Sequence, residues 1–232
     1  MAKDLIIVES PAKVKTISKF LGSGYTVEAS KGHVRDLPTR VLGVDEAHDF
    51  APQYEIVDSR KDVVEKLCTE AAHANTVYLA PDPDREGEAI AWHVAQLIKD
   101  KAHSIKRIQF NEITPRAVKE ALASPRELNK DLIDAQQARR VLDRLVGYKI
   151  SPILWKTVKR GISAGRVQSV SLRLIVDREK EREAFVQEEY WVFSANLLGD
   201  IPPSFLVQLQ KIKDKKAEIH NKEEAYALLE RL

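Results

Sequence analysis

Cysteine is almost absent from this chain, and its single cysteine, Cys68, excludes an intrachain disulfide bond and a cysteine-ligated zinc site. One free thiol fits a reducing compartment. No apolar run is long enough to cross a bilayer, and residues 1–4 lead directly into an apolar segment without the features of a signal peptide. We therefore expect a cytoplasmic protein without a membrane span.

The chain also lacks a strong overall charge, since its 232 residues carry a formal net charge of only +2. The charge is unevenly distributed, however. Residues 139–173 hold nine lysines and arginines but only one acidic residue, Asp143, so the rest of the chain is net acidic. A solvated helical face usually alternates signs, and this segment does not. A local basic block on a nearly neutral protein is typical of a nucleic-acid-binding groove.

Short apolar runs alternate with helical patterns in the first half of the chain. We expect strands at residues 5–8, 25–29, 77–80 and 104–110, and helices at 11–21, 61–72, 89–98 and 115–123. Thr114 is the expected N-cap of the last of these helices. Such alternation predicts an α/β fold whose mostly parallel sheet is covered on both faces. Ligands of such sheets collect at the carboxyl ends of strands.

The pattern changes near residue 129. Two long helices are expected at 132–145 and 167–182, joined by a link that contains glycine, serine and proline. Strands are expected at 190–197 and 204–210, followed by a helical pattern at 222–232. This last piece has about 45 residues, which is short for an independent domain. We therefore expect it to be the beginning of a larger, truncated domain.

The most informative motif is PDPDREGE at residues 81–88, which lies between a buried strand and an amphipathic helix. Asp82, Asp84 and Glu86 place three carboxylates at alternate positions, which supplies the oxygen ligands that Mg²⁺ prefers. Crowded carboxylates repel one another unless a cation is present. The alternative is helix capping, with Asp84 as the N-cap and Glu86 and Glu88 near the positive end of the helix.

A second motif, VESPAK at residues 8–13, places Glu9 at the end of the first strand and Lys13 on the first turn of a helix. Helix N-termini bind phosphate through free amides, and Lys13 would add a positive charge. Glu9 could act as a general acid or base, or as a metal ligand beside the acidic run. The alternative is a capping role for Glu9 and a solvated Lys13, which leaves the second acidic cluster unexplained.

The basic segment has features suited to DNA. Arg139 and Asp143 are four residues apart, so they share a helix face with Arg140. Arginines there can contact phosphates, while Asp143 can orient an arginine or accept a hydrogen bond from a base amine. Tyr148 and Trp155 follow among cations, where aromatics can stack on unpaired bases, although core packing is the commoner role of an aromatic residue.

Six motifs in order resemble bacterial DNA topoisomerase I, a type IA topoisomerase, over about residues 4–185. They are LIIVESPAK at 5–13, SKGHVRDLP at 30–38, the acidic run at 82–88, RIQFNEIT at 107–114, QARRVLDRLVGY at 137–148 and SAGRVQS at 163–169. The resemblance implies a Toprim, Rossmann-like domain at 1–125, a helical single-strand DNA-binding region at 126–186, and the start of the arch domain at 187–232. It also implies DNA as the partner, monomeric action and a nucleoid-associated location.

The resemblance further implies transient cleavage of one DNA strand through a 5′-phosphotyrosine, without ATP. Glu9 would assist proton transfer at the scissile phosphate, Lys13 would contact that phosphate, and Arg107 would lie nearby. Asp82, Asp84 and Glu86 would hold Mg²⁺, with Glu9 sharing the site. The DNA contacts implied in addition to those above are His33, Ser163, Ala164, Gly165, Arg166, Val167 and Gln168. For His33 a structural hydrogen bond is an equal alternative.

The sequence departs from the family in one respect. None of its six tyrosines, Tyr25, Tyr54, Tyr78, Tyr148, Tyr190 and Tyr226, lies in the family's nucleophile motif. We therefore expect the chain to supply a metal and phosphate half-site with a single-strand groove, and to be inactive by itself. Two alternatives remain: a Mg²⁺-dependent Toprim nuclease in which water attacks, and a non-catalytic single-stranded DNA-binding module.

Overall fold

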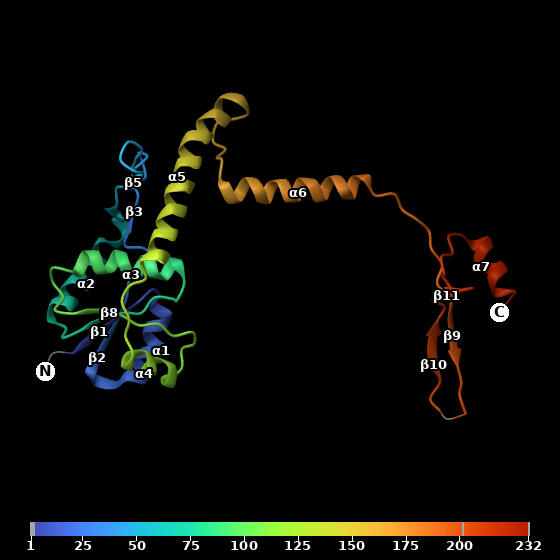
Figure 1. Cartoon of the computed structure of the whole chain (residues 1–232), viewed down its shortest axis with the longest axis horizontal. Coiled ribbons are helices and arrows are strands. Elements are labelled where there is room, and N and C mark those ends of the chain that lie inside the picture. The colour runs from blue at the N-terminus through green and yellow to red at the C-terminus, as the bar shows by residue number, and fades with distance from the viewer. Residues whose placement is uncertain (1–2, 201, 232) are drawn as a thin grey trace. The chain divides into compact units, whose positions relative to one another are not determined.

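The structure is a computed structural model that describes residues 3–200 and 202–231. The chain forms two compact units, Met1–Ser169 and Val170–Leu232 (Figure 1). Within the described residues, no helix is both long enough and apolar enough to span a membrane. The three-part division at residues 125 and 186 remains a prediction.

The first unit is built on a four-stranded parallel sheet. Its strands, in spatial order, are β2 (Tyr25–Ala29), β1 (Asp4–Val8), β7 (Val77–Leu79) and β8 (Ile105–Arg107). In the register, Ile6 of β1 lies opposite Val27 of β2 and Tyr78 of β7. The predicted α/β fold with a parallel sheet is confirmed, although β8 is shorter than the strand expected at 104–110.

Helices cover both faces of this sheet, as predicted. One face packs on α2 (Lys61–His73) and α3 (Arg85–Ile98), and the other on α1 (Pro11–Leu21) and α4 (Pro115–Ala123) (Figure 1). The side chains of β1 alternate between two hydrophobic clusters, because successive residues of a strand point to opposite faces. Thr114 caps α4 by accepting a hydrogen bond from the amide of Ala117, as expected.

Four very short strands lie between β2 and α2, where no strand was expected. They form two antiparallel pairs, of β3 (Arg35–Asp36) with β6 (Glu55–Ile56) and of β4 (Val44–Asp45) with β5 (Ala51–Pro52). Two-residue strands leave no readable alternation of apolar and polar residues, so sequence patterns do not reveal them. Short 3₁₀ turns occur at Gly22–Gly24 and Asp58–Arg60.

Helix α5 (Lys130–Thr157) is longer than predicted. We expected a helix at 132–145 followed by an irregular link, but the helix continues through Gly147 and Pro152. A proline inside a helix removes one backbone hydrogen bond, at a cost of about 3 kcal/mol. Before the proline, the side chains of Arg144 and Tyr148 donate hydrogen bonds to backbone carbonyls of residues 37–39. The link between the two long helices is therefore confined to residues 158–165.

Helix α6 (Arg166–Ala184) agrees with the helix predicted at 167–182, and the boundary between the two units falls within it. The rest of the second unit contains two hairpins and a helix. These are β9 (Ser194–Leu197) with β10 (Phe205–Gln208), β11 (Lys211–Ile212) with β12 (Lys215–Lys216), and α7 (Lys222–Leu229). The strands are shorter than predicted, and the buried side chains of Ile219 and Ala225 are the small apolar centre of this part.

Gly87 provides a test of how tightly the acidic run is packed. A Cβ atom built on Gly87 would lie 2.1 Å from the carbonyl oxygen of Asp82. We expect Gly87→Ala to lower the free energy of unfolding by about 1–3 kcal/mol or more, because backbone atoms must move apart. Urea denaturation measures this change.

Gly147→Ala is the matched control. Its Cβ would meet only the carbonyl oxygen of Ala164, at 3.9 Å, and alanine favours a helix by about 1 kcal/mol over glycine. This variant should be as stable as the wild type or more stable. Equal stability of Gly87→Ala and the wild type would contradict the packing described for the acidic run.

Candidate functional site

The candidate site lies where the strand order of the sheet reverses. β1 leads through α1 to β2 on one side, whereas β7 leads through α3 to β8 on the other. In parallel α/β sheets the crevice at such a point, outside the carboxyl ends of the strands, is the usual ligand site. Glu9 directly follows β1, and Asp82 follows β7 by three residues. The expectation that both motifs meet at one sheet edge is confirmed.

Lys13 joins the two motifs. Its ammonium donates a hydrogen bond to Glu9 Oε1 at 2.7 Å and a short one to Asp82 Oδ1. The backbone amide of Asp82 donates to the other oxygen of Glu9, at 3.2 Å. Partial burial lowers the pKa of Lys13, but the hydrogen bonds to Asp82 and Glu9 outweigh it, so the pKa lies above its ordinary value. The hydrogen bond from Lys13 is the main reason why the pKa of Asp82 is lowered.

The other two carboxylates of the run have separate contacts. Asp84 Oδ1 accepts a hydrogen bond from the amide of Gly87 at 2.7 Å, which confirms the capping alternative for this residue. Glu86 is half exposed, and its Oε1 lies 3.5 Å from His33 Nε2. All four carboxylates nevertheless line one open cleft of about 640 Å³. Lys31 and Arg60, which were not predicted as site residues, also line this cleft.

The cleft has the donor chemistry of a magnesium site without the converged geometry of one. Its carboxylate oxygens are the ligands that Mg²⁺ prefers. Within residues 3–200 and 202–231, however, no three acidic, histidine or cysteine side chains are arranged to hold a metal ion. Lys13 lies between Glu9 and Asp82 instead, and its ammonium offsets their repulsion. Metal binding by Glu9, Asp82, Asp84 and Glu86 therefore stays a prediction.

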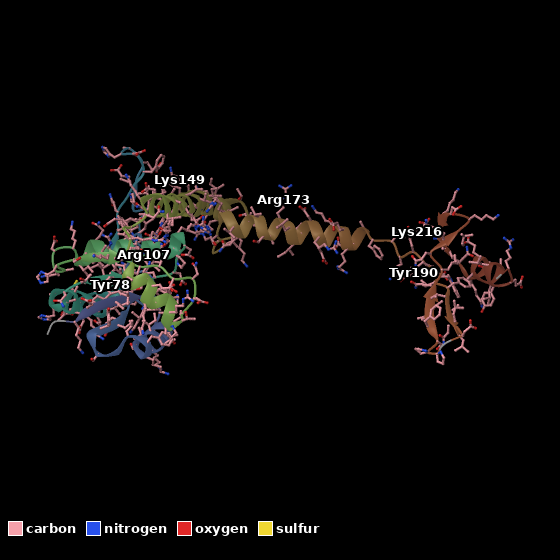
Figure 2. The ribbon with its side chains drawn as sticks, turned by 60° about the horizontal axis from the view of Figure 1, so that its bottom comes forward. Tyr78, Arg107, Lys149, Arg173, Tyr190 and Lys216 are labelled. Atoms are coloured by element: carbon pink, nitrogen blue, oxygen red, sulfur yellow. The ribbon has the colours of Figure 1, made fainter. Side chains whose placement is uncertain are left out.

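Arg107 lies beneath the acidic run and does not line the cleft. Its side chain is fully buried, and its Nε donates to Glu88 Oε2 at 2.9 Å (Figure 2 marks Arg107 within the first unit). Its other donors reach backbone carbonyls, including those of Pro81 and Asp82, each at 2.9 Å. The structure thus gives Arg107 a supporting position, and the catalytic role stays a prediction.

Glu88 is a residue whose position was not predicted from the sequence. The capping alternative placed it near the positive end of a helix, and the structure shows its side chain fully buried in an ion pair. Ala91 and Ala95, which are both buried, follow Glu88 by three and seven residues. This spacing puts Glu88 on the inner face of α3. That periodicity was the one signal in the sequence. The partner of Glu88, Arg107, is 19 residues away in the sequence, and this helical periodicity does not predict the pair.

A second, smaller cavity of about 170 Å³ lies beside the cleft. It is lined by His33, Arg35, Asp36, Tyr54, Glu86, His93, Gln136 and Arg140. Arg35 Nε donates to Nδ1 of the buried His93 at 3.1 Å. Burial, with the positive charge of Arg35, lowers the pKa of His93 to about 3, and burial also raises the pKa of Tyr54 to about 12. Glu86 therefore lines both the cleft and this polar cavity, and His33 lines the cavity beside it.

The predicted DNA-contacting residues of α5 have protein partners. Asp143 accepts from Arg166 at 2.9 Å and lies 3.8 Å from Arg139, which confirms that it can orient arginines. Arg140 forms a two-pronged ion pair with Asp36, and this contact outweighs the burial of Asp36 and lowers its pKa. Lys149 pairs with Glu46 (Figure 2 marks Lys149). Arg140 of α5 and Arg166 are therefore held in fixed positions, whereas Arg139 stays exposed.

The aromatic side chains of Tyr148 and Trp155 on α5 are each partly exposed to solvent. Tyr148 donates to the carbonyl of Thr39 at 2.6 Å, and the guanidinium of Arg144 lies 4.8 Å from its ring centre. Trp155 donates to the carbonyl of Ile162 at 2.6 Å while 47% of its surface stays exposed. Neither ring belongs to the hydrophobic core, so the core-packing alternative does not apply to them.

The segment from Ser163 to Gln168 folds back along α5. The amide of Ala164 donates to Ser151 Oγ at 3.0 Å, and both residues are buried. Arg166, Val167 and Gln168 begin α6. The structure therefore brings the C-terminal half of α5 and the start of α6 together, whereas Glu9, Lys13 and Asp82 form a separate cluster at the sheet edge.

Comparison with known proteins agrees with this architecture. Residues 4–113 match the Toprim domain family, and residues 127–232 match the DNA topoisomerase family. A solved structure of full-length topoisomerase I from Thermotoga maritima is 41% identical, with a TM-score of 0.78. That match covers 97% of this chain and 37% of the Thermotoga chain.

These matches define the class, a Toprim α/β domain followed by a region of the DNA topoisomerase family. The chain belongs to the bacterial type IA DNA topoisomerases. It spans 37% of the length of the solved relative, and the family resemblance inferred from the six motifs is confirmed.

The buried His93 gives a test by pH. Its folded pKa of about 3 lies below the ordinary value of 6.5, so below pH 6.5 the unfolded chain binds a proton that the folded chain does not. The free energy of unfolding should therefore fall as the pH drops below 6.5, by up to about 1.4 kcal/mol per pH unit. Urea denaturation between pH 7 and pH 4 measures the slope.

His93→Gln is the control, because it keeps an acceptor for Arg35 and does not titrate. Nearby Asp36, His33 and Arg35 remain in both proteins, so the difference between the two slopes isolates His93. The variant should show a shallower dependence on pH. Parallel curves for the two proteins would contradict a neutral, buried His93.

Proposed function

We propose that these residues supply the phosphate- and Mg²⁺-binding half of a type IA topoisomerase, which relaxes DNA through transient cleavage of one strand. The observation that carries the proposal is the cluster of Glu9, Lys13 and Asp82 at the point where the strand order reverses. Fixed acidic groups, a lysine and the N-terminus of α1 meet there. Family membership supports the same reaction.

The residues of the cluster have complementary roles in this proposal. The free amides at the start of α1 and the ammonium of Lys13 would bind the scissile phosphate. Glu9 would hold or transfer a proton at a phosphate oxygen. A phosphate that enters the cleft competes with Glu9 and Asp82 for Lys13, since both carboxylates bind its ammonium. Phosphate binding therefore frees carboxylate oxygens.

Glu9, Asp82, Asp84 and Glu86 would hold Mg²⁺, which would neutralise charge on the phosphate. Their oxygens line one cleft, and this shared lining supports the assignment. Arg107 would act by holding the backbone of the acidic run rather than by contact with the phosphate.

The partner in this proposal is single-stranded DNA, bound by α5 and residues 163–168. Arg139 and Arg166 flank Asp143 on this surface, and the half-exposed Trp155 offers a face for base stacking. His33 would contact DNA near Glu86. We further propose that the chain acts as a monomer in the cytoplasm, with the nucleoid.

The test is a cleavage assay with end-labelled single-stranded DNA and Mg²⁺, analysed on a denaturing gel after protease treatment. Because no tyrosine lies in the family's nucleophile motif, we expect the 232 residues alone to leave the DNA intact. A protein-linked 5′ end would overturn this expectation. Free ends that disappear in Asp84→Ala would favour the nuclease alternative, in which water attacks.

Binding of a labelled oligonucleotide, titrated against salt, tests the DNA surface directly. Removal of one side chain that binds a phosphate should reduce the slope of log affinity against log salt by about 0.7 for a single strand. Arg139→Ala should weaken binding and reduce the slope, because Arg139 is exposed and its acidic neighbour is 3.8 Å away. Arg116→Ala, on the exposed face of α4, removes the same charge and should have no effect.

A further inference from the structure

Glu88 joins two parts of the first unit that have different proposed ligands. Its Oε2 accepts from Arg107 Nε at 2.9 Å and from Gln109 Nε2 at 3.2 Å. Its Oε1 accepts from the backbone amide of Asn129 at 2.7 Å. Asn129 is the N-cap of α5 and accepts from the amide of Leu132. One buried carboxylate therefore accepts hydrogen bonds both from Arg107, which holds the backbone of the acidic run, and from Asn129, the N-cap of α5.

Arg107 carries the connection from Glu88 to the cleft. Its guanidinium donates to the carbonyls of Leu79, Pro81 and Asp82, which are the end of β7 and the beginning of the acidic run. The amide of the same Asp82 donates to Glu9. A displacement of the Asp82 backbone must therefore displace the guanidinium, or leave buried hydrogen-bonding groups without partners.

A second link runs parallel to the first. The backbones of Arg107 and Arg126 exchange two hydrogen bonds, of 2.9 and 2.7 Å. Arg126 lies three residues before Asn129, and its Nη1 reaches Gln109 at 3.3 Å. The chain that enters α5 is thus bound to β8 by its backbone and to Glu88 by one amide.

We propose that Glu88 and Arg107 are positioning residues that couple the acidic cleft to α5, so that Mg²⁺ at the cleft and a DNA strand on α5 change each other's affinity. This coupling rests on the proposed function of both surfaces. It assigns to the two residues a role in communication that needs no contact with DNA or metal.

The burial of the pair makes it suited to this role. Both side chains are fully excluded from water, and a buried charge that loses a partner is strongly unfavourable. The hydrogen bonds of Glu88 and Arg107 therefore persist or break together rather than stretch one by one. A ligand that shifts the acidic run passes the shift to Asn129, and thermodynamic linkage requires the reverse effect to be equal.

The amide of Asn129 offers a way to cut this connection at one atom. Asn129 has a φ of −84°, near the value that proline requires, and Asn129→Pro removes the N–H that binds Glu88. Asn129→Ala is the matched control, because it also loses the side-chain cap but keeps the N–H. A comparison of the two variants isolates the hydrogen bond to Glu88.

The experiment measures amide hydrogen exchange in residues 81–90 and 126–135, with MgCl₂ and with NaCl at equal ionic strength. In the wild type and in Asn129→Ala we expect Mg²⁺ to slow exchange in both segments, by about fivefold or more in the second. In Asn129→Pro the backbone link between Arg107 and Arg126 remains, so Mg²⁺ should still slow exchange in residues 81–90 but should slow residues 126–135 less than in Asn129→Ala. A (dT)₁₂ oligonucleotide should protect residues 81–90 in the wild type and in Asn129→Ala, and less in Asn129→Pro.

The possible outcomes separate the two proposals. If Mg²⁺ slows exchange in residues 81–90 of the wild type but not in residues 126–135, the coupling is overturned and the proposed metal binding stands. Protection of neither segment would overturn both. Equal slowing of exchange in residues 126–135 in Asn129→Pro and Asn129→Ala would overturn the route through Glu88. If Asn129→Pro does not fold, Glu88→Gln replaces it. Glutamine has one acceptor oxygen, and its amide nitrogen cannot accept from the second donor, so one of the two links is lost and transmission should fall.

Discussion

A charged pair with no access to water underlies the arrangement of the candidate site. Glu88 and Arg107 have no exposed side-chain surface, and between them they bind the end of β7, the acidic run, β8 and the start of α5. Buried ion pairs contribute little net stability, because desolvation offsets their attraction, but the loss of one partner is severe. Such a pair defines one arrangement of the backbone around it. The position of Asp82 in the cleft follows from that arrangement.

The cleft itself is organised by basic side chains that lie beside its carboxylates. Lys13 lies between Glu9 and Asp82, and His33 lies near Glu86. In the proposed function, a metal ion would replace Lys13 and His33 as the partner of these carboxylates, and a phosphate would bind Lys13. The carboxylates therefore have a partner both with and without bound ligands. A site of this kind stays folded without its ligands, since the repulsion of like charges is offset in their absence.

Much of the first unit could be predicted from the sequence, because its signals are local. The apolar residues 5–8, the cap Thr114 and the alternation of strands and helices each depend on a few neighbouring residues. The parallel sheet then predicted that Glu9 and the acidic run would share one edge. Contacts over long sequence separations could not be predicted in the same way. The pair of Glu88 and Arg107 depends on the order of the strands, and α5 binds the backbone of residues 38 and 39, at sequence separations of 106 and 109 residues.

The contacts of α5 also affect the entropy of binding. Arg140 is fixed by Asp36, Arg144 by two carbonyls of the preceding loop, and Arg166 by Asp143. A flexible arginine loses side-chain freedom when it binds a strand, at about 0.5–1.5 kcal/mol for each residue immobilised. These arginines gave up that freedom when the protein folded. The helix is therefore preorganised: the acidic and carbonyl partners weaken its positive field, but they leave a smaller entropic penalty to any anionic strand that it receives.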